Sequence, residues 1–357
     1  MSSVGMRPCG DYKTDYGRDQ TIFETTTARN FVIAGIVLAC LMPLVADRYV
    51  LSLMIQIGYL GIAALGLNIL VGFTGQISIG HAAFFGFGAF TSAYLNNHFA
   101  IPVFFCIPLA GLATAVVGFA FGLPAARIKG LYLAIATLAA QYILEDFFAR
   151  SYWFTGGPSG SIAQPFTLFG FSFDSDRSYF YVVLAYTIVA YLLATNLMRS
   201  RDGRALVAVR DHYLSAEMMG INLTKYRTLS FAIAAFLAGI GGALYAHYLS
   251  VVSSEGFNLL LSVQFLAMVI IGGLGSILGS LLGTVFMVLL PEAMDAGTRA
   301  LSGTWIDTAL GLKDNVVFLR DMAIGAVIIG FLIFEPDGLA HRWRQIKAYW
   351  KLYPFSY

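Results

Sequence analysis

The sequence predicts an all-α, polytopic membrane protein with about ten transmembrane helices, short cytoplasmic helices and both termini in the cytoplasm. Hydrophobic residues make up 58% of the 357 residues and charged residues only 12%, whereas soluble domains carry about 25% charged residues. The mean hydropathy is +0.73. The 37 glycines fit close helix packing in lipid. The three cysteines lack metal-ligand spacing and imply no disulfide framework.

Ten apolar segments, most of them near the span length of about 20 residues, account for the predicted helices. They are Phe31–Ala46, Tyr49–Phe73, Gly75–Phe99, Ile101–Ala126, Leu131–Ala149, Tyr179–Met198, Thr228–Val252, Asn258–Met294 (two spans that turn near Gly272–Gly279) and Met322–Phe334. With ten crossings, the two ends of the chain lie on the same side of the membrane.

A polar island, residues 199–227, interrupts the apolar segments in the second half. It holds six basic residues, Arg199, Arg201, Arg204, Arg210, Lys225 and Arg227. A basic side chain at the bilayer centre costs about 2.5–3.5 kcal/mol, and short basic loops face the cytoplasm, so we expect the island there.

The island has the pattern of two short helices, Gly203–Arg210 and His212–Met219. Asp211 is placed to cap the second helix, and Gly220 is placed to end it. The apolar residues among these positions suit docking to a soluble cytosolic partner. A folded connector without a partner is the alternative.

Three further regions lie outside the predicted spans. Residues 1–30 lack the apolar core of a signal peptide and are predicted to be a cytoplasmic tail. Residues 150–178 form a polar, glycine- and aromatic-rich outer loop, and residues 341–357 form a basic aromatic cytoplasmic tail. All four tryptophans fall in loops or this tail, as interfacial anchoring predicts. The permease domain between the tails is residues 31–340.

A glycine-rich break between the second and third spans is the candidate translocation path. Its residues are Gly72, Thr74, Gly75, Gln76, Ser78, Gly80 and His81. Non-helical backbone at membrane depth is tolerated only inside protein or along a wet cavity, and transporters use such breaks to bind polar substrate groups. The alternatives are a plain cytosolic turn and, for His81, a structural hydrogen bond.

Two ridges of small residues recur at intervals of four, Ala235, Gly239 and Ala243 in one span and Gly275, Gly279 and Gly283 in another. Such ridges let helix backbones approach closely. Packing is the expected role, and the partner helix is left open between this chain and another. The second ridge lacks the spacing of a dinucleotide-binding loop.

The spans are poor in ionisable residues, and Glu145 and Asp146, near the outer end of their span, are the acids to consider. This scarcity disfavours a self-sufficient secondary transporter or channel. The chain has no GxxxxGK[ST] loop and no convincing nucleophile or metal constellation, which disfavours ATP hydrolysis by this chain and a membrane-embedded enzyme. No bound cofactor, metal or nucleic acid is expected.

Several stretches in the same order resemble LivM-type permease subunits of branched-chain amino acid ABC importers. They are residues 66–84 (GLNILVGFTGQISIGHAAF), 155–158 (TGGP), 203–211 (GRALVAVRD), 216–226 (AEMMGINLTKY), 234–239 (AAFLAG) and 334–339 (FEPDGL). The resemblance runs from about Tyr49 to Leu339 and leaves out both tails.

This resemblance implies a non-enzymatic translocation subunit in a bacterial inner membrane. It implies a homologous LivH-type permease partner, two cytosolic ATPase subunits that carry ATP and magnesium, and an extracytoplasmic binding protein that delivers the amino acid. The candidates for coupling to the ATPases are Arg204, Arg210, Asp211, Ala216, Glu217 and Gly220. Permeases of the same family for urea, short amides or other amino acids are the alternative.

Overall fold

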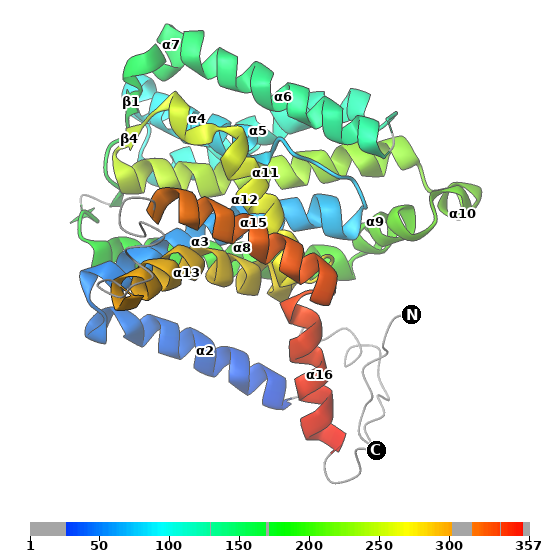
Figure 1. Cartoon of the computed structure of the whole chain (residues 1–357). Helices are drawn as coiled ribbons and strands as arrows, with labels where there is room; N and C mark the ends of the chain where they lie inside the picture. Colours follow the sequence, from blue (N-terminus) through cyan, green and yellow to red (C-terminus); the bar gives the residue numbers. More distant parts are fainter. Residues whose placement is uncertain (1–25, 129, 169–170, 302–315, 336, 353–357) are drawn as a thin grey trace.

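A computed structural model describes residues 26–128, 130–168, 171–301, 316–335 and 337–352 (Figure 1). The helices are α2 (Thr26–Val45), α3 (Arg48–Asn68), the π-helical turn η1 (Ile69–Phe73), α4 (His81–Phe99), α5 (Val103–Ala125), α6 (Leu131–Arg150), α7 (Tyr152–Thr155), α8 (Asp176–Arg199), α9 (Arg201–Asp211), α10 (Tyr213–Met218), α11 (Leu223–Leu249), α12 (Leu259–Gly272), α13 (Ile277–Leu301), α15 (Val316–Phe334) and α16 (Leu339–Leu352). The short 3₁₀ helices are η2 (Gly157–Ser159) and η3 (Ser254–Phe257).

The described residues confirm a polytopic membrane protein. Six helices are long and apolar enough to cross a membrane, Arg48–Phe73, Val103–Ala125, Leu131–Arg150, Asp176–Arg199, Leu223–Leu249 and Ile277–Gly297. A seventh span results if the bent pair Ile324–Phe334 and Leu339–Tyr349 is one crossing, and Arg29–Val45 and Leu259–Gly272 are shorter apolar helices. A helix also lies in each of the ten predicted segments. The count of about ten crossings stays a prediction.

Helices cross the predicted boundaries of both tails, and these boundaries stay predictions. Helix α2 begins at Thr26, inside the predicted N-terminal tail, whose residues 1–25 lie outside the described residues. Much of the C-terminal tail belongs to helix α16. The loop with Trp305 also lies outside the described residues.

Helix α11 is the centre of the bundle and packs against α3, α4 and α5. Its small residues permit this contact on several sides. A Cβ built on Gly239 would lie 2.5 Å from Oγ1 of Thr114 on α5, and one built on Gly242 would lie 1.8 Å from the carbonyl oxygen of Phe85 on α4. Ala235 and Ala243 are fully buried. This ridge therefore packs against helices of the same chain.

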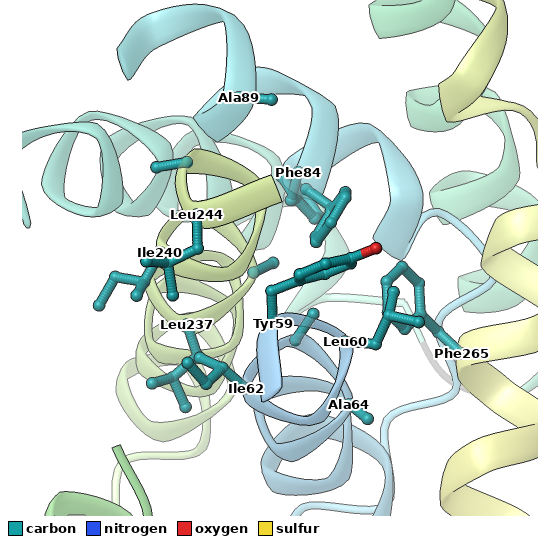
Figure 2. Close-up of a cluster of buried hydrophobic side chains, with 14 of the residues drawn as sticks. Tyr59, Leu60, Ile62, Ala64, Phe84, Ala89, Leu237, Ile240, Leu244 and Phe265 are labelled. Carbon is teal, nitrogen blue, oxygen red and sulfur yellow. The ribbon is translucent and has the colours of Figure 1, made fainter. Parts of the chain in front are cut away.

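Aromatic and aliphatic side chains fill the space between these helices. Figure 2 shows Tyr59 of α3 among side chains of α4, α11 and α12. The Tyr59 ring meets the Tyr245 ring edge-on, with centroids 5.5 Å apart. Such aromatic pairs add about 0.5–1.5 kcal/mol beyond area burial.

Helices α12 and α13 form a close antiparallel hairpin that turns between Gly272 and Ile277, inside the predicted region. A Cβ built on Gly283 would lie 1.8 Å from the carbonyl oxygen of Met268, and one built on Gly279 would lie 2.7 Å from the carbonyl oxygen of Gly272. Gly275 has a φ of +74°, which favours glycine in this turn. The second ridge therefore joins the two arms of one hairpin.

The two ends of the bundle differ. Helices α9 and α10 lie at one end, and α7 lies with strands β1 (Ser161–Ile162) and β4 (Val251–Val252) at the other (Figure 1). Strands β1 and β4 pair antiparallel, which ties the predicted outer loop to the end of α11. Strands β2 (Thr167–Leu168) and β3 (Phe171–Ser172) pair within that loop.

Candidate coupling and translocation site

The predicted break is a buried, non-helical segment between η1 and α4. Helix α4 begins at His81, and residues 74–80 have no helical structure. The side chains of Thr74, Gln76, Ser78 and His81 are buried. The segment is therefore enclosed by protein along much of its length, unlike a solvated turn.

Hydrogen bonds hold this segment against α11 and α6. The Gln76 side-chain amide donates to Oγ of Ser230, at 2.6 Å, and to Oγ1 of Thr74, at 3.1 Å. The backbone N–H of Ile79 donates to Oγ1 of Thr137, at 3.0 Å. A Cβ built on Gly80 would lie 2.3 Å from the carbonyl oxygen of Thr137, so this close approach requires glycine.

Three buried polar atoms of the segment have no hydrogen-bond partner among the described residues. They are Oε1 of Gln76, Oγ of Ser78 and Nδ1 of His81. The other ring nitrogen of His81 lies 2.9 Å from the carbonyl oxygen of Ala63, so the ring also has a structural hydrogen bond. Because buried polar groups are almost always paired, each of the three can bind water or a polar substrate group.

The first turn of α4 is held by polar side chains that the sequence analysis did not single out. The backbone N–H of Ala82 donates to Oγ of Ser262, and that of Ala83 donates to Oε1 of Gln141, both at 2.9 Å. The Gln141 amide also donates to the carbonyl oxygen of Phe257, at 2.7 Å. These bonds satisfy N–H groups that a helix start leaves without intrahelical partners.

Asn68 joins the end of α3 to the α12–α13 turn, a role that its position in an apolar run did not indicate. Its amide nitrogen donates to the carbonyl oxygen of Ser276, at 2.7 Å, and to Oγ of Ser280, at 3.0 Å. Its amide oxygen accepts from the backbone N–H of Gly275, at 2.9 Å. A Cβ built on Gly72 would lie 2.1 Å from that amide oxygen, so Gly72 leaves room for the junction.

Replacing Asn68 with leucine is expected to destabilise the protein by about 2–4 kcal/mol. The volume is nearly kept, but the partly buried N–H of Gly275 loses its acceptor, at a cost of about 1–3 kcal/mol for each unsatisfied group. Thermal unfolding in detergent measures the loss. The control is Asn97→Leu, because Asn97 is exposed at the end of α4 and its amide donates to the carbonyl oxygen of Ile162 at the surface. An equal fall for both variants would contradict the assignment.

Helix α9 packs its apolar face on the bundle and reaches the break. Ser200 caps its start by accepting from the N–H of Gly203, at 3.2 Å. Leu206 and Val209 are buried. Nη1 of Arg210 donates to the carbonyl oxygen of Gly72, at 2.8 Å. The polar island and the candidate translocation path are thus in direct contact.

The predicted helix pair exists, but its capping differs from the prediction. The prediction that Asp211 caps the second helix is wrong, because Asp211 is the last residue of α9 and its carboxylate accepts from Nε of Arg210, at 2.9 Å. His212 takes the cap position, where its Nδ1 accepts from the N–H of Ser215 at 3.3 Å. Gly220 ends the turn as predicted, with φ +83° and a bond from Ile221 N–H to the Ala216 carbonyl oxygen.

Helix α10 presents an exposed surface beyond the end of the bundle. Met218 and Met219 are 88% and 85% exposed, and Glu217 is exposed beside them, whereas Ala216 is buried. Methionine is enriched in protein interfaces. Arg204 is exposed on α9, where its guanidinium donates to the carbonyl oxygen of Arg199. The arrangement offers a mixed apolar and charged surface to a partner.

The fold and this site define a multi-pass membrane permease. The chain matches the model of the family described as "Branched-chain amino acid transport system / permease component" over residues 49–332. It belongs to this family of transport permeases, which are not enzymes. The resemblance predicted from the motifs is confirmed.

Individual relatives agree with this assignment. The chain is 33% identical over 296 residues to the high-affinity branched-chain amino acid transport system permease protein LivM of Salmonella typhimurium, covering 76% of this chain and 69% of the relative. It is 28% identical to a probable LivM of Methanocaldococcus jannaschii, covering 81% and 88%. It is 27% identical to the autoinducer 2 import system permease protein LsrC of an Enterobacter species, covering 68% and 65%. No solved structure matches the chain.

Proposed function

We propose that this chain is the transmembrane subunit through which an ATP-driven importer passes branched-chain amino acids across a bacterial inner membrane. The LivM relatives, with the higher identities, are named for these substrates, and the LsrC relatives are named for import of autoinducer 2. The basic island favours a cytoplasmic position for the α9–α10 end under the positive-inside rule. The strand-bearing end then faces outward, towards an extracytoplasmic binding protein.

The proposed complex contains a homologous LivH-type permease and two cytosolic ATPase subunits. The exposed part of α10, with Glu217, Met218 and Met219, suits docking to an ATPase. ATP and magnesium would bind to those subunits, since this sequence has no GxxxxGK[ST] loop. Ala216 and Gly220 would support the docking surface, one by packing inward and the other by ending the turn.

The contact between Arg210 and the Gly72 carbonyl is the observation that carries the mechanism. A displacement of α9 and α10 by the ATPases would act through this bond on η1, the π-helical turn that follows α3. The same turn leads into the buried break, where Gln76, Ser78 and His81 each have a polar atom without a hydrogen-bond partner in the described part of the chain. Those atoms suit the ammonium and carboxylate groups of an amino acid in transit. We therefore propose the break as part of the path, with Gly72, Thr74, Gly75 and Gly80 shaping its backbone.

The substrate is tested by uptake into proteoliposomes that hold the purified complex, ATP and the binding protein. We expect accumulation of leucine, isoleucine and valine that requires ATP. Preferential accumulation of urea or short amides would contradict the proposed substrate and leave the importer mechanism standing.

Replacing Met218 and Met219 together with aspartate is expected to weaken ATPase binding at least about tenfold. Truncated or charged interface residues at a hot spot cost about 2 kcal/mol or more, and about 1.4 kcal/mol corresponds to a factor of ten. Pull-down of the ATPase subunits measures the loss. The matched control replaces two exposed apolar residues at the opposite end, Leu249→Asp and Val251→Asp. Unchanged ATPase binding by the Met218 and Met219 variant would contradict this docking surface.

A further inference from the structure

Helix α16 separates apolar and basic residues along its length. Trp343 and Ile346 are three residues apart and so share a face; they are 54% and 51% exposed. Arg344 and Lys347, also three apart, lie on the adjoining flank and are exposed. The sequence of α16, LAHRWRQIKAYWKL, contains no acidic residue. The helix therefore has an exposed apolar stripe beside a cationic one.

Among the described residues, the start of α16 makes close contacts with the bundle. Gly338 has φ +72°, and a Cβ there would lie 2.5 Å from Cα of Gly273 in the α12–α13 turn. Ala340, in the first turn of α16, is buried. The remainder of the helix extends away from the bundle at the end where α9 and α10 lie (Figure 1). The segments on either side of the break after α15 are bent by 48°.

The cations of α16 differ in their partners. Arg342 forms an ion pair with Glu335, so its charge is largely compensated within the chain. Among the described residues, no carboxylate pairs with Arg344 or Lys347. Two uncompensated cations next to an exposed tryptophan are the features of a helix that lies in the interfacial layer of a membrane. Long basic side chains place their charge among headgroups while their stems cover apolar surface.

We propose that α16 lies in the headgroup layer of the cytoplasmic leaflet and binds anionic phospholipids through Arg344 and Lys347. Trp343 and Ile346 enter the boundary of the acyl chains. The inference rests on the proposed orientation of the α9–α10 end and is independent of the transported substrate. Because α16 begins against Gly273, lipid binding also holds the α12–α13 turn, which carries the Asn68 junction.

The test uses the full chain in nanodiscs of phosphatidylcholine alone or mixed with phosphatidylglycerol. Trp153→Phe, Trp305→Phe and Trp350→Phe leave Trp343 as the single reporter, and lipids brominated near the headgroup quench it. We expect stronger quenching with phosphatidylglycerol, reduced by salt. In the double variant Arg344→Gln/Lys347→Gln, we expect the equilibrium ratio of membrane-bound to unbound α16 to fall about fivefold for each cation removed. Each basic residue near an anionic surface contributes about that factor to membrane binding. The control, Arg29→Gln/Arg127→Gln, removes two exposed charges outside α16 and should keep the wild-type response.

A second readout needs no tryptophan substitution. Native mass spectrometry counts the phosphatidylglycerol molecules retained by the chain in detergent, and we expect fewer on Arg344→Gln/Lys347→Gln than on the wild type or the control. Equal quenching in both lipid mixtures, or equal lipid retention by all variants, would overturn the proposal. The proposal would also be overturned if added ATPase subunits shielded Trp343 from quenching while the lipid composition had no effect. In that case α16 would be a protein-docking helix. None of these readouts depends on transport.

Discussion

Replacing Arg210 with alanine is expected to reduce ATP-driven uptake by about tenfold or more while the protein stays folded. The guanidinium donates to the Gly72 carbonyl oxygen in η1, the turn that follows α3, and is partly exposed, so its removal leaves the buried core unchanged. A hydrogen bond with a charged partner contributes about 1.5–3 kcal/mol. Without this hydrogen bond, a motion of α9 is transmitted less effectively to the buried break.

The measurement compares uptake with ATP hydrolysis in proteoliposomes. We expect Arg210→Ala to keep ATPase binding and hydrolysis but to lose uptake, and Arg210→Lys to recover part of it, since lysine keeps the charge but not the planar fork. The control is Arg201→Ala, which removes the same charge from the exposed first turn of α9. Normal coupled uptake by Arg210→Ala would show that this contact does not transmit the motion.

Replacing Gly242 with alanine is expected to abolish most of the folded protein. The new Cβ would lie 1.8 Å from the carbonyl oxygen of Phe85 and 3.1 Å from the backbone nitrogen of Ala89, both of them backbone atoms of α4. No side-chain rotation relieves such a contact, so α4 and α11 must separate. Overpacking of a filled core costs about 1–3 kcal/mol and sometimes more. Here the separation also affects the neighbouring contacts of α11 with α3 and α5.

The yield of monodisperse protein in detergent and its thermal unfolding midpoint measure this effect. Gly330→Ala is the matched control, because Gly330 lies in helix α15 and a Cβ there meets no atom within 4 Å. Alanine is favoured over glycine in a helix by about 0.8–1 kcal/mol. The control should therefore be at least as stable as the wild type. A stable, well-expressed Gly242→Ala protein would contradict the packing of α11.

The elements of this fold followed from features that are local in the sequence. Apolar length predicted helices in the right places, and glycines marked the turn between α12 and α13. The two short helices of the polar island were predicted from their local pattern, with Gly220 marking the end of the second. The length and hydropathy of the helices left the number of crossings open. Helix α4 is too polar, and α12 is too short, to be recognised as a membrane span by these criteria.

The site depended on contacts between segments far apart in the sequence. Asn68, Gln141 and Ser262 are polar residues inside largely apolar helices. Their roles appear only when α3 meets the α12–α13 turn and α4 meets α6 and α12. The cap of α10 was wrong for a related reason. Asp211 has the side chain of a cap, but Arg210 engages its carboxylate. His212, with its non-helical backbone, occupies the N-cap position of α10 instead.

The most direct test of the proposed importer is to purify the chain from its native membrane in mild detergent and to identify which subunits accompany it and whether the assembly hydrolyses ATP. The account predicts a stoichiometric complex with a second permease and two ATPase subunits, and ATP hydrolysis that rises with the loaded binding protein. A single chain that carries substrate at full rate without ATP would contradict it. The coupling would then have to come from the chain's own residues, with Glu145, Asp146 and His81 as the first to examine.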